Sequence, residues 1–195
     1  MGGEVVYYLY MTFIILAVVA IIIVWLVLSY NGFVALTNRV KEALSDIDVQ
    51  SKRRYDLIPN LVETVKGYAA HESGTLEQVT EMRTRAMNAP AGSADKAQAE
   101  DMLSGALKSL FAVSENYPNL KANENFLALQ TELSDTENKM MAARRFYNSV
   151  VQDLNTRLQS FPGNVIGSTF GFKPADFFAL DASQAAAKDP VKVQF

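Results

Sequence analysis

The sequence predicts an all-α protein, in which an N-terminal transmembrane helix is followed by an antiparallel bundle of about four long helices and an irregular C-terminal tail that contains aromatic residues. Two observations lead to this prediction. Residues 5–38 carry no charged side chain, and this run exceeds the ~20 residues that are needed to span a bilayer. Across most of the remaining chain, apolar residues recur at steps of three and four, which is the period of an amphipathic helix.

The transmembrane helix is centred on residues 13–28, where every side chain is apolar. Three tyrosines precede this segment and Tyr30 follows it, as aromatic residues do at membrane interfaces. Residues 1–11 contain no Lys or Arg, and the apolar run is longer than the core of a signal peptide, so we expect an uncleaved anchor. The side chains expected to contact lipid are Phe13, Ile14, Ile15, Leu16, Val18, Ile22, Trp25 and Leu26.

Positive charges follow the anchor and are absent before it. Arg39, Lys41 and the cluster at residues 52–54 lie on its C-terminal side. Because basic residues favour the cytoplasmic side of a membrane, we expect the N-terminus outside and the helical body in the cytoplasm.

The first helix of the body is expected to continue the anchor without a break. Its apolar stripe has nearly a heptad period with a gap around Ser51 and Arg54. Pro59 lies within the stripe and is expected to kink the helix without ending it, because the stripe continues in phase beyond it. The stripe consists of Val34, Val40, Leu44, Ile47, Ile58, Leu61, Val65 and Tyr68.

Three further helices are expected before the tail. A short one ends near Met87, a loop with Pro90 and Gly92 follows, and the next helix begins at Ser93 or shortly after it. Residues 116–119 end that helix because Pro118 disfavours helical geometry in the residue before it. The last helix is predicted over residues 120–161.

The predicted organisation is an N-terminal segment and anchor over residues 1–30, a bundle over residues 31–162 and a tail over residues 163–195. Disordered tails are usually poor in aromatic residues, so this tail is expected to pack on the bundle, on a second copy or on a partner. Its aromatic candidates are Phe170, Phe172, Phe177, Phe178 and Phe195.

The composition argues against several classes of function. The net charge of −3 does not favour nucleic acid as a partner, and the absence of Cys removes thiolate metal ligands and Cys nucleophiles. His71 is the single histidine, and no carboxylate precedes it at the spacing of a di-iron bundle. We therefore expect no enzyme activity, no metal, no cofactor and no small-molecule substrate.

Charged residues on the first and last body helices form a candidate polar network. They would meet if the two helices pair antiparallel, and such a network would set the register of that pairing. A partner-binding face and ordinary solvated charge are the alternatives. The candidates are Asp46, Asp48, Arg53, Arg54, Asp56, Glu137, Arg144, Arg145 and Asn148.

Two segments resemble a known family. Residues 39–72 read RVKEALSDIDVQSKRRYDLIPNLVETVKGYAAHE, and residues 117–162 include YPNLKANENFLALQTELSDTENKMMAARRFYNSVVQDLNTRLQSFP. Together with the single N-terminal membrane helix, they are similar to the LemA family of bacterial membrane-anchored proteins. Leu44 stands where that family often has Trp, and Ser51 where it often has Leu. The resemblance implies a largely α-helical body that is built as a bundle or coiled coil and anchored to a bacterial inner (cell) membrane, and it supplies no catalytic residues.

The features together predict a non-enzymatic scaffold or interaction protein that contacts the lipid bilayer and self-associates as a homo-oligomer. The alternative is an accessory or signalling subunit with a protein partner in a membrane complex, such as a protease, transporter or stress-response assembly. A lipid-sensing anchor would need a polybasic cluster next to the membrane, and Arg39 and Lys41 are too sparse for one.

Overall fold

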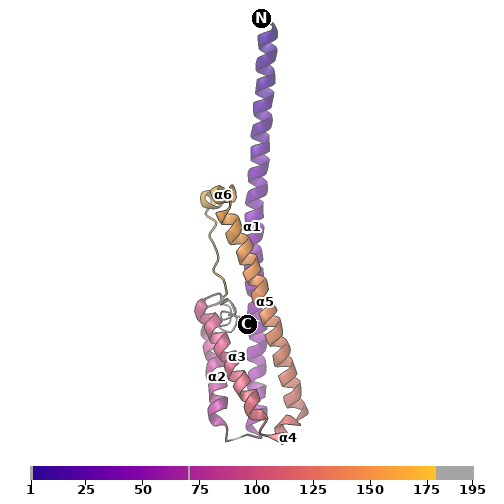
Figure 1. Cartoon of the computed structure of the whole chain (residues 1–195), viewed down its shortest axis with the longest axis vertical. Helices are drawn as coiled ribbons and strands as arrows, with labels where there is room; N and C mark the ends of the chain where they lie inside the picture. The colour runs from indigo at the N-terminus through magenta and orange to yellow at the C-terminus, as the bar shows by residue number, and fades with distance from the viewer. Residues whose placement is uncertain (1, 70, 179–195) are drawn as a thin grey trace, which may run out of the picture. The chain divides into compact units, whose positions relative to one another are not determined.

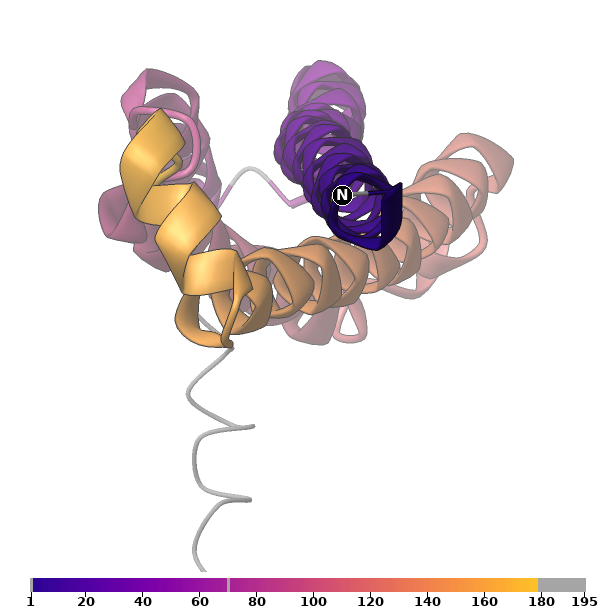
Figure 2. The same cartoon turned by 90° about the horizontal axis from the view of Figure 1, so that it is seen from above.

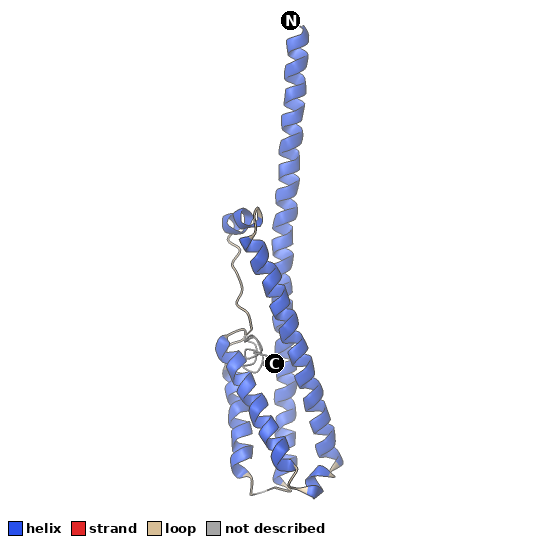
Figure 3. Cartoon of the chain, viewed as in Figure 1, coloured by secondary structure: helices blue, strands red, loops and turns tan. Residues whose placement is uncertain are grey.

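The computed structural model describes residues 2–69 and 71–178, and all regular structure within them is helical (Figures 1 and 3). The all-α prediction is therefore confirmed. In chain order the helices of this described part are α1 (Gly2–Lys66), α2 (Ser73–Asn88), α3 (Ala94–Ser114), α4 (Pro118–Lys121), α5 (Glu124–Gln159) and α6 (Gly163–Phe170).

The chain divides into two compact units, and both long helices contribute to each. Within the described residues, the anchor unit comprises residues 2–41 and 150–175, and the bundle unit comprises residues 42–149 and 176–178. In the bundle unit, the C-terminal part of α1, then α2, α3 and the N-terminal part of α5, run alternately up and down (Figure 1). This arrangement is the antiparallel bundle that the sequence predicts.

The N-terminal part of α1 presents apolar side chains on all its faces. It belongs to the one helix of the described residues that is long and apolar enough to cross a membrane. A helix that is apolar all round is not stable alone in water, whereas lipid is a suitable solvent for it. The predicted lipid contacts are all exposed in the structure, namely Phe13, Ile14, Ile15, Leu16, Val18, Ile22, Trp25 and Leu26.

The C-terminal part of α1 buries one continuous heptad stripe. Ser51 and Arg54, which form the gap in the apolar pattern, are buried in phase with their apolar neighbours. The polar gap is thus directed into the bundle core and not toward water. The stripe consists of Ile47, Ser51, Arg54, Ile58, Leu61 and Val65.

Pro59 lies inside α1, and the helix continues through it to Lys66. Proline has no N–H, so the carbonyl of Tyr55, one turn earlier, loses its partner within the helix. The guanidinium of Arg83 on α2 replaces that partner, with Nε donating to the Tyr55 carbonyl oxygen at 2.7 Å. A contact from another helix therefore compensates for the helix breaker.

Helix ends follow local capping. Ser93 caps α3, since its hydroxyl accepts from the Lys96 N–H at 3.0 Å, as predicted. The predicted start of the last helix at residue 120 is wrong: the single turn of α4 comes first, and α5 begins at Glu124. Asn123 determines this start, because its side-chain oxygen accepts from the Phe126 N–H at 3.0 Å.

The tail begins with a helix that the sequence analysis did not expect. Helix α6 folds back at the C-terminal end of α5 (Figures 1 and 2) and buries Ile166 and Gly167. A Cβ at Gly167 would lie 2.5 Å from a methyl of Leu158 on α5, so glycine permits the close approach. Gly171 ends α6 with a φ of 74°, a conformation that glycine favours. The residues from there to Phe178 form no regular structure.

Candidate functional site: a buried ion-pair network and a groove beside it

Arg54 of α1 is the centre of a polar network inside the bundle unit. Its side chain is fully buried and forms ion pairs with Glu100 of α3 and Glu137 of α5. It also donates to the hydroxyl of Ser104 at 2.8 Å. One guanidinium therefore joins three helices, which its planar set of five donors allows.

The network extends from Glu100 toward α2. The hydroxyl of Tyr55 donates to the Glu100 carboxylate, and the ammonium of Lys96 donates to the Tyr55 hydroxyl at 2.9 Å. Lys96 also donates to the Ala86 carbonyl at the end of α2, at 2.7 Å. Arg54 and Lys96 balance the charges of Glu100 and Glu137, so the cluster is neutral as a whole, as a buried charge cluster needs to be.

The surroundings of the network fix its protonation state. Burial opposes ionisation of Glu100, but the charge of Arg54 and the hydrogen bonds from Tyr55 and Arg54 outweigh it and hold the pKa of Glu100 below its ordinary value. Burial and the neighbouring Glu100 carboxylate raise the pKa of Tyr55 well above its ordinary value. Near neutral pH, Glu100 is therefore an acceptor and Tyr55 a donor, which suits a fixed structural contact rather than proton transfer.

A second, partly buried ion pair connects α5 with α3, and its arginine also contacts the tail. Arg144 donates to a carboxylate oxygen of Asp101 at 2.9 Å, and its guanidinium lies 4.9 Å from the centre of the Phe178 ring. The Asn148 amide holds the Phe178 backbone from both sides, donating to its carbonyl at 3.0 Å and accepting from its N–H at 2.8 Å.

The structure brings together only some of the predicted network residues. Arg54 meets Glu137 as the antiparallel pairing requires, and the exposed Arg53 pairs instead with Glu132. The remaining predicted charges lie outside the network, since Asp48 is half-buried and the others are exposed: Asp46, Asp56 and Arg145.

The tail aromatics have different environments. Phe172 stacks on Phe33 with ring centres 5.0 Å apart, and Phe178 is buried beside Tyr147. Phe170 and Phe177 are exposed. Phe195 lies outside the described residues.

Sequence reasoning missed Glu100, and with it Lys96 and Tyr55. A signal was present, because Glu100 precedes Leu103 by three residues and Leu107 by seven and so lies on the apolar stripe of α3. A charge in phase with a buried stripe implies a buried partner. The unpaired gap at Arg54 on α1 was the matching signal.

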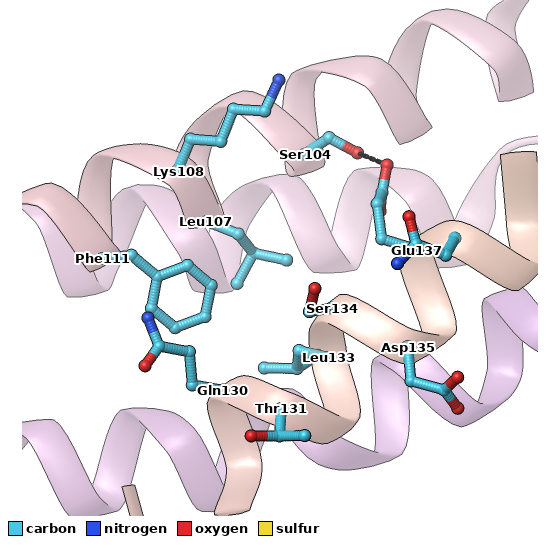
Figure 4. Close-up of a pocket in the computed structure, with 11 residues that line it drawn as sticks. Ser104, Leu107, Lys108, Phe111, Gln130, Thr131, Leu133, Ser134, Asp135 and Glu137 are labelled. Carbon is cyan, nitrogen blue, oxygen red and sulfur yellow. Dashed lines mark hydrogen bonds between the residues drawn. The ribbon is translucent and has the colours of Figure 1, made fainter. Parts of the chain in front are cut away.

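A groove of about 660 Å³ lies beside the network, between α3 and α5 (Figure 4). Leu107, Phe111 and Leu133 form its apolar part, and polar side chains from both helices surround them. At one end, the Ser104 hydroxyl donates to Glu137 at 3.0 Å, so groove and network share two side chains. Within the described residues, no group of three or more His, Cys, Asp or Glu side chains is placed to hold a metal ion.

Comparison with known proteins gives the family and several relatives. The model of the LemA family matches residues 43–195. The chain is 28% identical over 189 residues to Magnetosome protein MamQ 2 of Paramagnetospirillum magneticum, which covers 84% of this chain and 69% of that protein. It is 29% identical over 132 residues to Protein LemA of Metamycoplasma hominis, covering 66% of this chain and 59% of that protein. Magnetosome protein MamQ of Magnetospirillum gryphiswaldense is 25% identical over 178 residues, with 78% and 65% covered.

Together with the exposed apolar helix, these likenesses indicate a membrane-associated protein.

Proposed function

This chain belongs to the LemA family, and from that premise we propose that it is a non-enzymatic scaffold that self-associates at the bacterial inner membrane. Helix α1 anchors it, with the N-terminus outside and the bundle in the cytoplasm. The basic residues Arg39 and Lys41, which follow the apolar run, support this orientation.

The observation that carries the proposal is that the buried charged side chains contact one another. Arg54, Lys96 and Glu100 have their polar atoms directed at one another inside the bundle, where they join helices and are closed to a substrate. The groove between α3 and α5, by contrast, opens at the surface and combines an apolar floor with a polar rim (Figure 4). Protein interfaces have this same arrangement of apolar core and polar rim.

A second copy of the chain is the proposed occupant of the groove. Helices pack by inserting side-chain ridges of one into grooves of another, and each copy offers both a groove and exposed helix faces. Contact between two different surfaces of identical chains can be repeated, which produces a ring or a filament.

The test is the mass and the images of particles extracted gently from native membranes. The proposal expects a large symmetric particle that contains only this chain. In Ser134→Arg, a long charged side chain enters from an exposed position on the groove, so the particle should dissociate while the thermal unfolding of the chain is unchanged.

Ser149→Arg makes the same substitution at an exposed position of α5 outside the groove lining, and it should leave the particle intact. A small particle with a second polypeptide would contradict self-assembly and make the chain an accessory subunit. Orientation is tested separately with a reporter enzyme fused after Phe195 that works on only one side of the membrane.

A further inference from the structure

Within the anchor unit, α6 lies against the part of α1 where the apolar span ends. The Phe170 ring lies 5.0 Å from the Tyr30 ring, and Phe172 lies 5.6 Å from the same ring. Tyr30 comes two residues after Leu28, the last residue of the continuous apolar run. At 1.5 Å per residue, Tyr30 is about 3 Å beyond the edge of the hydrocarbon if α1 stands upright in the bilayer. Helix α6 is thus held at the depth of the lipid headgroups.

The surface around α6 exposes several large apolar side chains. Phe161, which lies between α5 and α6, is 83% exposed, and Val165 and Phe170 of α6 are each 54% exposed. Single exposed apolar residues are common, but here three large ones occur within ten residues at one end of the unit. Their neighbour Ile166 is buried against Phe33 and Leu154, so α6 is held in place while these side chains face outward.

Positive charges lie within this segment, and acidic ones flank it. Arg157 and Lys173 are the charged residues between Leu154 and Ala175, while the exposed Asp153 and Asp176 lie just outside its two ends. Arg157 lies with its guanidinium 5.0 Å from the centre of the Phe33 ring, and Lys173 is exposed three residues after the end of α6. Exposed apolar side chains next to positive charges are the combination that binds anionic bilayer surfaces.

We propose that the bend between α5 and α6 is a second membrane contact, in which Phe161, Val165 and Phe170 enter the interface of the same bilayer that α1 crosses. The occupant of this surface is an anionic lipid bilayer. The contact would hold the bundle end of α1 at a fixed depth, because a helix that only crosses a bilayer is free to tilt and rotate about one point of attachment. The proposal rests on the anchoring by α1 and is independent of self-association.

The absence of Cys from the chain allows a direct test with single-Cys variants of the full protein. Phe161→Cys and Val165→Cys are each labelled with an environment-sensitive fluorophore. The labelled proteins are then reconstituted in vesicles of phosphatidylcholine with phosphatidylglycerol. Quenchers are attached to lipids at the headgroup or at the middle of the acyl chain. Leu28→Cys reports the span of α1, and Gln152→Cys reports an exposed position of α5 about two turns before its end.

We expect the headgroup quencher to reduce emission at positions 161 and 165 by about twofold or more, because interfacial helices enter about 5–10 Å into the headgroup boundary. The probe at position 152 should stay in water, and the probe at position 28, at the edge of the apolar run, should respond to the headgroup quencher with or without phosphatidylglycerol. Replacing phosphatidylglycerol by phosphatidylcholine should weaken quenching at 161 and 165 only.

Three results would overturn the proposal. Emission typical of water at positions 161 and 165, with normal quenching at 28, would show that the bend stays outside the bilayer while the anchor is correct. Protection from water without quenching by lipid would mean that protein covers the surface. Loss of quenching at position 28 would reject the anchoring itself, and the second contact with it.

Discussion

The contact between Arg83 and the Tyr55 carbonyl predicts a measurable coupling between two residues on different helices. Arg83→Met removes the donor but keeps most of the apolar stem. The carbonyl would then be left without a partner, because Pro59 provides no N–H to it and Tyr55 is buried. An unpaired buried polar group costs about 1–3 kcal/mol. We expect the free energy of unfolding to fall by about 1–2 kcal/mol, since the contact is only partly buried.

The cost of Arg83→Met should depend on whether residue 59 is proline. In Pro59→Ala, the new N–H lies one turn after Tyr55 and can donate to the same carbonyl. Arg83→Met in that background should therefore cost about 1 kcal/mol less than it does in the natural sequence, which is the coupling energy of a double-mutant cycle. Arg85→Met, on an exposed position of the same helix, should change stability by less than about 0.5 kcal/mol.

The assay is thermal unfolding of the full chain in mild detergent, followed by circular dichroism. For a body of this size, about 1 kcal/mol corresponds to a Tm shift of about 2–4 °C. Amide hydrogen exchange at residue 59 in Pro59→Ala gives an independent reading, because a protected amide shows that the new hydrogen bond has formed. Equal costs of Arg83→Met in both backgrounds would refute the reasoning.

Three further predictions concern the network and the bend. Arg54→Met should lower stability by about 3–5 kcal/mol, because the buried Glu100 then keeps only Lys96, 3.7 Å away, to balance its charge; Arg54→Met with Glu100→Met should recover most of this loss in chemical denaturation, and an additive loss would contradict it. The pKa of Glu100 is lower in the folded chain than in the unfolded one, so its contribution to stability is complete above the unfolded pKa of about 4.3 and is lost as the pH falls through the folded pKa. The Tm of Glu100→Gln should therefore vary less over this acid range than the Tm of the natural chain. Parallel curves of Tm against pH would contradict the assignment. A Cβ at Gly163 would lie 2.3 Å from the Arg157 carbonyl oxygen, so Gly163→Ala should speed amide exchange in α6 at least tenfold, a loss of about 1.4 kcal/mol of local stability, while exchange in α3 stays the same.

The periodicity of apolar residues was sufficient to predict the main helices, because each of them buries one apolar face. It was also sufficient for the pairing of α1 with α5, since Arg54 and Glu137 interrupt two stripes that must face each other. The ends were harder: residues 120–123 have helical propensity, but the Asn123 cap starts α5 later. The stripe through Pro59 predicted that the helix continues, whereas the compensating donor on α2 could not be seen in the pattern of α1.

Helix α6 could not be predicted for a different reason. Its sequence, GNVIGSTF, contains two glycines and β-branched residues, which have low helix propensity. It forms because Ile166 and Gly167 are buried against α5 and α1 of the anchor unit. Tertiary contacts thus decide its structure, and a single sequence does not show them. Glu100 differs from α6, because its place on the apolar stripe of α3 signals a buried partner in the sequence, although not which helix supplies that partner.

The position of the network within α1 explains why a thin bundle would keep buried charge. The stripe of α1 has a heptad period on both sides of Arg54, so a shift of α1 by one heptad along its neighbours would still pair apolar side chains. Such a shift would separate Arg54 from Glu100 and Glu137, leaving Arg54 and Glu137 without charged partners and Glu100 with Lys96 alone. Buried ion pairs contribute little net stability compared with apolar packing, but breaking one by removing a partner is strongly destabilising. The network therefore penalises the wrong registers more than it stabilises the correct one, and in a helix that continues into the membrane span the register fixes where the bundle begins.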